Sequence, residues 1–187
     1  MSNRVLDLRN SEVFLFTSRH GAQESGAIVT WITPCTLATG HDRIMSALSR
    51  SNLTTELLLK SGTFIVQLLA EDQWPLMATF GLTSGRDSNK FEGLPITRSK
   101  SGLPVVSGTC GWMECKVGEL LDLGDRVICV ADVVSVHREG HSLPLCKSEA
   151  IQKFSPEIQK RFKEKFAADA ARDANLIRLL SAKAPAS

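Results

Sequence analysis

The chain has 187 residues and 43% hydrophobic content, enough for one globular domain with a substantial buried core. Its net charge of +2 argues against partners bound through overall charge, such as nucleic acid or an anionic membrane. No apolar run approaches the ~20 residues of a membrane span, and residues 1–10 are mixed polar rather than signal-like. We therefore expect a cytoplasmic protein that binds neither nucleic acid nor a membrane.

Up to about His137 the chain mostly has the pattern of short strands. Residues 19–26 are interpreted as a hairpin loop, and Asp-Leu-Gly-Asp at 122–125 as a turn between two long strands. This long final pair, without regular strand–helix alternation, favours an antiparallel barrel over a doubly wound parallel sheet. Segments rich in β-branched and aromatic residues, or alternating in polarity, predict strands at residues 12–18, 26–33, 43–49, 63–69, 111–121 and 126–137.

Three helices are predicted. The first follows Asn52, a potential N-cap, and ends at Gly62, while the second covers residues 72–82. Ser155, followed by Pro156, begins a long third helix. One apolar stripe on this helix must be covered by the barrel or by another subunit; it consists of Ile158, Phe162, Phe166 and Ala170.

The C-terminal part differs from the rest in charge. From Lys147 onward there are 9 basic and 5 acidic residues, an excess that we assign to a solvated helix face. No repeat or long linker divides the chain. We therefore predict a barrel domain at residues 1–145 and a helical extension of the same domain at 146–187.

The five cysteines form no Cys-x-x-Cys pair and predict reduced thiols. His137, His141 and Cys146 could in principle approach one metal ion, but their spacing matches no standard metal site. We therefore predict no metal site.

Three segments offer groups that a ligand could use. A helix beginning at Leu53 presents free backbone N–H groups and the hydroxyls of Thr54 and Thr55, which suit a phosphate but also serve as ordinary caps. The segment 84–90 places an arginine and a lysine beside hydroxyl groups, as a phosphate loop or a solvated loop would. Trp31, near a Thr-rich strand end, could fill the core or lie against a planar ring.

The order and spacing of these segments resemble the flavin reductase-like family, FMN-binding split barrels of the flavoredoxin type. Each motif is weak alone, and the resemblance rests on all of them in order, over residues 10–140. The matching segments are A-I-V-T-W-I-T-P-C-T, S-N-L-T-T-E-L-L-L-K-S-G-T-F-I-V-Q-L, S-G-R-D-S-N-K-F-E and the hairpin G-W-M-E-C-K-V-G-E-L-L-D-L-G-D-R-V-I-C-V-A-D-V.

The resemblance implies a mainly β fold with helices: an antiparallel Greek-key split β-barrel followed by C-terminal helices. It also implies bound FMN, with Lys90 as a main phosphate contact and Thr54 and Thr55 meeting the phosphate from the helix start. The loop residues Ser84, Gly85 and Arg86 would help to bind the phosphate, and Asn52 and Phe91 are also counted among the cofactor-binding residues. Thr36 would supply a further hydroxyl, and the flavin ring would lie along Ala27, Val29, Thr30, Trp31, Ile32 and Thr33.

Three positions depart from the family pattern. A-T-G-H-D-R replaces a D-P-P element, Lys90 follows asparagine rather than aspartate, and Arg126 replaces a histidine near flavin and nicotinamide. Arg126, counted among the cofactor-binding residues, could stabilise reduced flavin or bind a phosphate of NADPH, or it could point outward from the strand.

The resemblance implies an FMN-dependent oxidoreductase, similar to NAD(P)H:flavin reductases, acting as a homodimer on small-molecule electron donors and acceptors. Hydride chemistry belongs to the flavin, so no side chain is assigned a catalytic role. Two alternatives remain open: an FMN-bearing electron carrier with a protein partner, and a non-catalytic flavin- or ligand-binding barrel.

Overall fold

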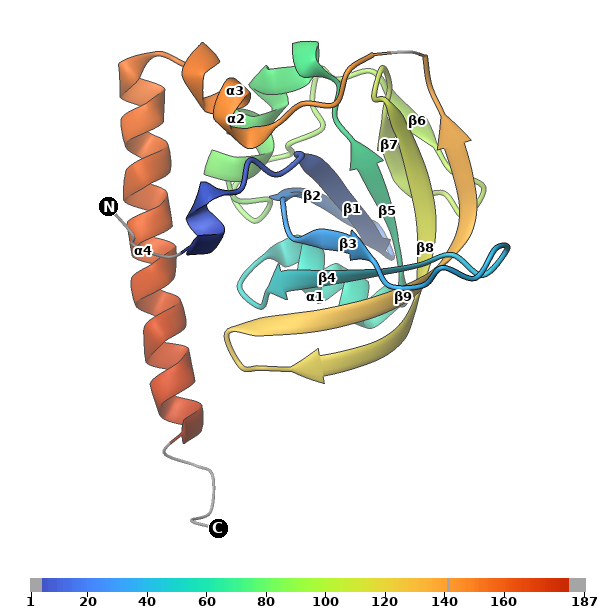
Figure 1. The fold of residues 1–187 in the computed structure, drawn as a ribbon, viewed down its shortest axis with the longest axis horizontal. Helices are drawn as coiled ribbons and strands as arrows, with labels where there is room; N and C mark the ends of the chain where they lie inside the picture. The colour runs from blue at the N-terminus through green and yellow to red at the C-terminus, as the bar shows by residue number, and fades with distance from the viewer. Residues whose placement is uncertain (1–4, 141, 182–187) are drawn as a thin grey trace.

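A computed structural model describes residues 5–140 and 142–181 (Figure 1). Seven antiparallel strands form one sheet in the order β2-β1-β5-β8-β9-β4-β3, and β6 pairs with β7 in a small second sheet. The strands are β1 (Phe14–His20), β2 (Gln23–Val29), β3 (Ile32–Pro34), β4 (Arg43–Ser49), β5 (Thr63–Leu68), β6 (Ile96–Arg98), β7 (Pro104–Val106), β8 (Gly111–Asp122) and β9 (Arg126–Arg138).

Helices cover one side and the ends of this sheet (Figure 1). The described part of the chain contains no helix that is both long enough and apolar enough to cross a membrane. The helical segments are η1 (Val5–Leu8), α1 (Leu53–Ser61), η2 (Glu71–Gln73), α2 (Trp74–Leu82), α3 (Lys147–Lys153) and α4 (Pro156–Ser181).

The connection between β2 and β3 explains why the sheet curls. These strands lie at opposite edges of the seven-stranded sheet, yet only Thr30 and Trp31 separate them in the chain. In a flat sheet the two edges would be roughly 29 Å apart at ~4.8 Å per strand, whereas this link reaches only about 10 Å. The sheet therefore has to bend until its edges approach. The predicted fold class, a mainly antiparallel split barrel with C-terminal helices, is confirmed by this curled half-barrel sheet.

The core has two main parts, one inside the curl and one beneath the helices. Inside the curl, the rings of Phe16 and Phe64 stack with centroids 4.3 Å apart. On the other side of β1, Leu15 packs with Phe80 of α2 and Phe154, which follows α3. The helices thus stabilise the outer face of the half-barrel by covering its apolar residues.

The predicted loop at residues 19–26 is wrong. β1 and β2 continue toward each other until His20 pairs with Gln23, leaving a two-residue turn at which Gly21 has φ +60°. The misleading signal was the polar composition of β2. Ser25 is buried in the strand and accepts a hydrogen bond from the Thr54 hydroxyl, so its polarity is satisfied internally.

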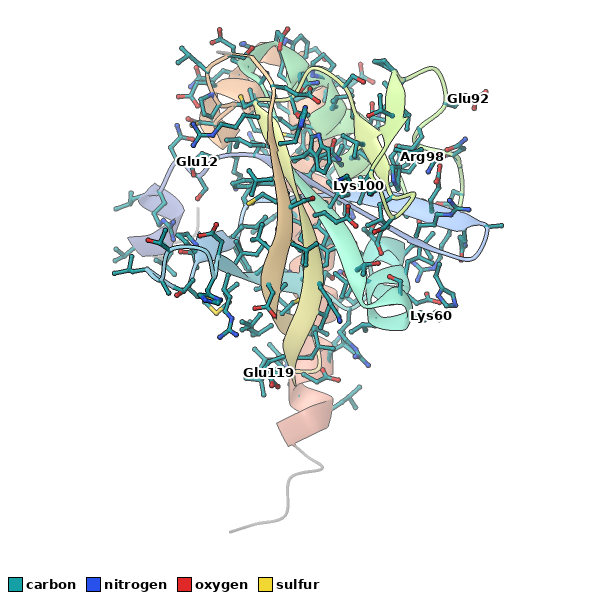
Figure 2. All side chains as sticks on the ribbon, turned by 90° about the vertical axis from the view of Figure 1, so that its right-hand side faces the viewer. Glu12, Lys60, Glu92, Arg98, Lys100 and Glu119 are labelled. Carbon is teal, nitrogen blue, oxygen red and sulfur yellow. The ribbon has the colours of Figure 1, made fainter. Side chains whose placement is uncertain are left out.

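The other predicted strands are found with small shifts. The single strand predicted at residues 26–33 is divided between β2 and β3, because the chain changes from one sheet edge to the other at Trp31. The long β8–β9 hairpin is present, with Gly124 at φ +84° in its turn. Figure 2 shows Glu119 near the free end of this hairpin.

Two of the predicted helix starts differ in their capping. Asn52 occupies the N-cap position of α1, but its side chain makes no capping hydrogen bond, so that part of the prediction is wrong. Ser155 does cap α4, since its hydroxyl accepts from the Ile158 N–H at 3.4 Å. The apolar stripe of α4 is covered only at its start: Phe162 packs on the core beneath α2, whereas Phe166 is 59% exposed.

Candidate functional site

A cavity of about 420 Å³ lies between the half-barrel and α4. Its walls come from β2, the start of α1, the end of α2 with the following loop, the start of β9, and α4. Half of the residues predicted to bind the cofactor line it, although they come from four separate segments. They are Ala27, Asn52, Thr54, Ser84, Gly85, Arg86, Lys90 and Arg126.

Lys90 supplies a buried cation to this cavity. The residue is only 9% exposed, and its ammonium donates hydrogen bonds to the carbonyl oxygens of Gly26 at 2.9 Å and Phe80 at 3.1 Å. An ammonium has three N–H donors, so one remains for a ligand. Burial, and to a lesser degree the positive charge of Lys165, lowers the pKa of Lys90 from 10.5 to about 8.

The start of α1 lies against the loop that follows α2. Thr54 is buried, and its hydroxyl donates to the Ser25 hydroxyl at 3.1 Å. Gly85 approaches the same point so closely that a Cβ atom there would collide with the Ser25 hydroxyl. The absence of a side chain at residue 85 therefore lets the loop, the helix start and β2 meet at one end of the cavity.

Arg86 joins the loop to α1. Its guanidinium donates to the Ser51 carbonyl at 3.0 Å and to the Glu56 carboxylate at 2.9 Å. Lys60 first, and Arg86 second, lower the pKa of Glu56. Arg86 therefore holds the loop against α1 as well as lining the cavity.

Arg86 also borders a larger and more open hollow of about 730 Å³ on the outer side of the loop. Arg98, labelled in Figure 2, also lines this hollow. The other arginines of this hollow are already bound within the chain: Arg98 pairs with Glu24, and Arg19 donates to the Gly21 and Gly102 carbonyl groups. The smaller cavity, which holds the spare donor of Lys90, is therefore the better candidate site.

Arg126 lines another part of the cavity, and Trp31 of the β2–β3 connection packs against it from outside the lining residues. The Arg126 guanidinium is 4.7 Å from the centre of the Trp31 ring, and it pairs with Asp173 of α4 at 2.7 Å. Arg126 therefore does not point freely into solvent. Trp31 is 48% exposed, so the alternative that it fills the core is wrong.

The remaining predicted residues do not line the cavity. Val29 and Phe91 are buried core residues, and Thr55 is buried on α1. Thr30, Ile32, Thr33 and Thr36 lie on or beside the β2–β3 connection, outside the cavity wall. Their assignment to the flavin remains a prediction.

Sequence reasoning missed the residues of α4 that line the cavity. Lys165, Asp169 and Arg172 lie on one face of α4 and contribute to the cavity wall. The assignment of the C-terminal charges to a merely solvated face is therefore wrong for these three residues. Their spacing of four and three positions could have indicated a common face, but not what that face covers.

The described residues contain no group of three or more His, Cys, Asp or Glu side chains that could hold a metal ion. Of the three residues considered from the sequence, His137 is exposed on β9 and Cys146 precedes α3. His141 lies outside the described residues.

Known proteins that resemble this chain share its sequence pattern and its fold. A high molecular weight rubredoxin from Moorella thermoacetica is 24% identical over 135 residues, covering 71% of this chain and 58% of that protein. HsaB, the reductase subunit of a flavin-dependent monooxygenase from Rhodococcus jostii, is 34% identical over 86 residues, or 46% of this chain and 43% of that protein. The chain thus spans about half the length of such relatives.

Solved structures show the same fold at lower identity. Nitrilotriacetate monooxygenase component B from Mycobacterium thermoresistibile superposes with a TM-score of 0.70 at 22% identity, covering 82% of this chain and 87% of that chain. Flavoredoxin from Methanosarcina acetivorans superposes with a TM-score of 0.67 at 17% identity, covering 80% and 81%. The family profile described as "Flavin reductase like domain" matches residues 8–149, which include every barrel strand of the structure. The chain therefore belongs to the flavin reductase-like family.

Proposed function

We propose that the protein is an FMN-dependent oxidoreductase that transfers a hydride from a nicotinamide dinucleotide to flavin. The observation that carries this proposal is the cavity lined by the buried Lys90, whose ammonium uses two of its three N–H donors on carbonyl groups. A relative from Agrobacterium fabrum named FMN reductase (NADH), 35% identical over 86 residues, supports NADH as the donor.

The donor set suits a flavin phosphate. Lys90 provides the cation, Ser84 provides a hydroxyl group, and the first turn of α1, which includes Thr54, directs backbone N–H groups to the same end of the cavity. These are the groups that a phosphate with two negative charges requires. Ser25 and Ser49, which also line the cavity, add hydroxyl donors that the sequence did not single out.

When bound, FMN supplies the hydride chemistry, since its ring can accept and pass on two electrons. The task of the chain is to bind and orient it. Lys90 and Thr54 fix one end, while Arg126, backed by the ring of Trp31, provides a flat, positively charged group at another part of the wall. Asp173 holds the guanidinium of Arg126 in place. No side chain is assigned proton transfer.

We further propose a homodimer that acts in the cytoplasm. A partner surface is supported by exposed apolar side chains: Phe166 on the α4 stripe, and Leu121 and Leu123 at the β8–β9 turn.

The five free cysteines fit a reducing compartment. Relatives named as reductase subunits of flavin-dependent monooxygenases support a flavin-using partner enzyme.

A second candidate is an electron carrier that retains FMN and exchanges electrons with a protein. The observation that favours it is the long match of 135 residues to a high molecular weight rubredoxin. The two candidates differ in whether a free nicotinamide dinucleotide reduces the bound flavin.

An anaerobic titration separates these functions. Purified protein is titrated with FMN, and then with NADH or NADPH, while flavin absorbance is recorded. We expect about one FMN per chain and bleaching by a dinucleotide at catalytic rates. Bound FMN without bleaching would favour the carrier, and failure to bind FMN would exclude both.

A further inference from the structure

The face of α4 that lines the cavity carries a fixed arrangement of charges. The carboxylate of Asp169 forms ion pairs with Lys165 at 3.1 Å and with Arg172 at 2.9 Å. Asp173, one helical position beyond Arg172, pairs with Arg126 of β9 at 2.7 Å. The contact between Asp173 and Arg126 joins α4 to the half-barrel, and the two ion pairs of Asp169 orient the cations of α4.

The cavity wall has more positive than negative groups. It carries five cationic side chains, two from the loop after α2, one from β9 and two from α4, against the carboxylates of Asp87 and Asp169. Lys90 has no carboxylate partner within the described part of the chain; its bonds go to two carbonyl groups. Burial is the main cause that lowers the pKa of Lys90, and the positive charge of Lys165 on the facing helix adds to it.

Arg172 leaves one donor unused. Its terminal nitrogens bind Asp169 and Asp173, but its Nε is buried and has no hydrogen-bond partner among the described residues. A buried charged donor without a partner costs free energy. An anion between α4 and the barrel would supply this partner and would relieve the repulsion between Lys90 and Lys165.

We propose that Lys165 and Arg172 of α4 are phosphate-binding residues that act together with Lys90, so that a bound phosphate and the docked α4 stabilise each other. This rests on the proposed flavin function, because the phosphate is that of FMN. α4 is then a cover whose position depends on the ligand, and the coupling works in both directions: the docked helix tightens phosphate binding, and phosphate tightens helix docking.

The coupling predicts that α4 variants lose affinity for ligands with a phosphate but not for ligands without one. We compare two α4 variants: the single change Lys165→Met and the α4 pair, Lys165→Met with Arg172→Met. The control pair is Lys160→Met with Arg161→Met. The side chains of Lys160 and Arg161 are exposed and do not line the cavity. FMN and riboflavin, which has the ring without the phosphate, are titrated into each protein. We expect FMN affinity to fall at least tenfold in the α4 pair and less in Lys165→Met. Riboflavin affinity should stay within twofold, and the control pair should match the wild type.

Hydrogen exchange tests the helix directly. In the wild type, FMN and inorganic pyrophosphate should both slow amide exchange in α4, and riboflavin should not; in the α4 pair this protection should be lost. Equal losses for FMN and riboflavin, or unchanged FMN affinity, would overturn the proposal. If the wild type binds no flavin, the proposed function fails, but the pyrophosphate experiment still tests the cation cluster. Slower amide exchange in α4 with pyrophosphate supports an anion site at this cluster, and unchanged exchange overturns it.

Discussion

The guanidinium of Arg126 lies 4.7 Å from the centre of the Trp31 ring while its Nη2 binds Asp173 at 2.7 Å. One side chain thus joins the β2–β3 connection, the start of β9 and α4. A family histidine at this position could not make both contacts over such distances, because its ring is shorter and is not always charged. Arginine in place of histidine therefore adds a permanent positive charge to this wall of the cavity. It also adds the contacts that connect β9 to Trp31 and to α4.

We expect Arg126→His to lower the midpoint potential of bound FMN, or to reduce the ratio of kcat/KM for NADPH to kcat/KM for NADH. A positive charge near the ring stabilises anionic reduced flavin, and a charge at the mouth binds a donor phosphate. Spectroelectrochemistry and kcat/KM for the two dinucleotides measure these effects.

Asp173→Asn is the matched variant for this prediction. It removes the nearer of the two carboxylates that pair with Arg126, leaving Asp125 at 3.6 Å, so the potential should shift in the opposite direction. If both variants bind FMN and neither the potential nor the dinucleotide preference changes, Arg126 has only a structural role.

Replacing Lys90 should weaken FMN binding about ten- to a hundredfold, since one charge-assisted contact contributes roughly 1.5–3 kcal/mol. The change is Lys90→Met, and the matched control is Lys100→Met on the exposed turn between β6 and β7 (Figure 2). Fluorescence titration with FMN and riboflavin measures the effect. Equal FMN affinity in the two variants would exclude Lys90 as a phosphate contact.

FMN affinity should decrease as pH rises through about 8, because the pKa of Lys90 is lowered to that value and only the protonated form attracts phosphate.

The stability of the free protein should increase over the same pH range. Between the folded pKa near 8 and the unfolded value of 10.5, the unfolded chain binds more protons, so the free energy of unfolding rises with pH. Lys90→Met should abolish both trends, as denaturant titrations and FMN titrations at pH 7 to 10 can show. A Lys90→Met protein with the same two pH profiles as the wild type would contradict this assignment.

Gly85→Ala should destabilise the protein by roughly 1–3 kcal/mol and weaken FMN binding, because the new methyl group collides with the Ser25 hydroxyl. Ser25→Ala removes that hydroxyl, and the double variant should recover part of the lost stability. Urea unfolding of the two single variants and the double variant completes the cycle. Purely additive losses would show that the two residues are not in contact.

The homodimer is tested by light scattering at several concentrations. We expect a mass twice that of the 20.4 kDa chain. Phe166→Glu, which charges an exposed apolar position of α4, should favour the monomer. A concentration-independent monomer mass for the wild type would rule out the dimer.

The sequence by itself determined the family, and it predicted the class of cofactor. The elements that indicate a phosphate site are local: hydroxyl residues at a helix start, and a loop with small residues and a lysine. The long β8–β9 hairpin was also predictable, because its turn needs a glycine at positive φ and its strands show the required composition.

Only the tertiary structure decided what the polar residues of β2 and the charged face of α4 do. A buried strand serine such as Ser25 looks like a loop residue until its partner Thr54, 29 positions away, is brought to it. Likewise Asp173 lies 47 positions from Arg126, and no local pattern links them. A charged helix face has the same sequence whether it meets water or a cavity, since helical spacing fixes which residues share a face but not what lies opposite.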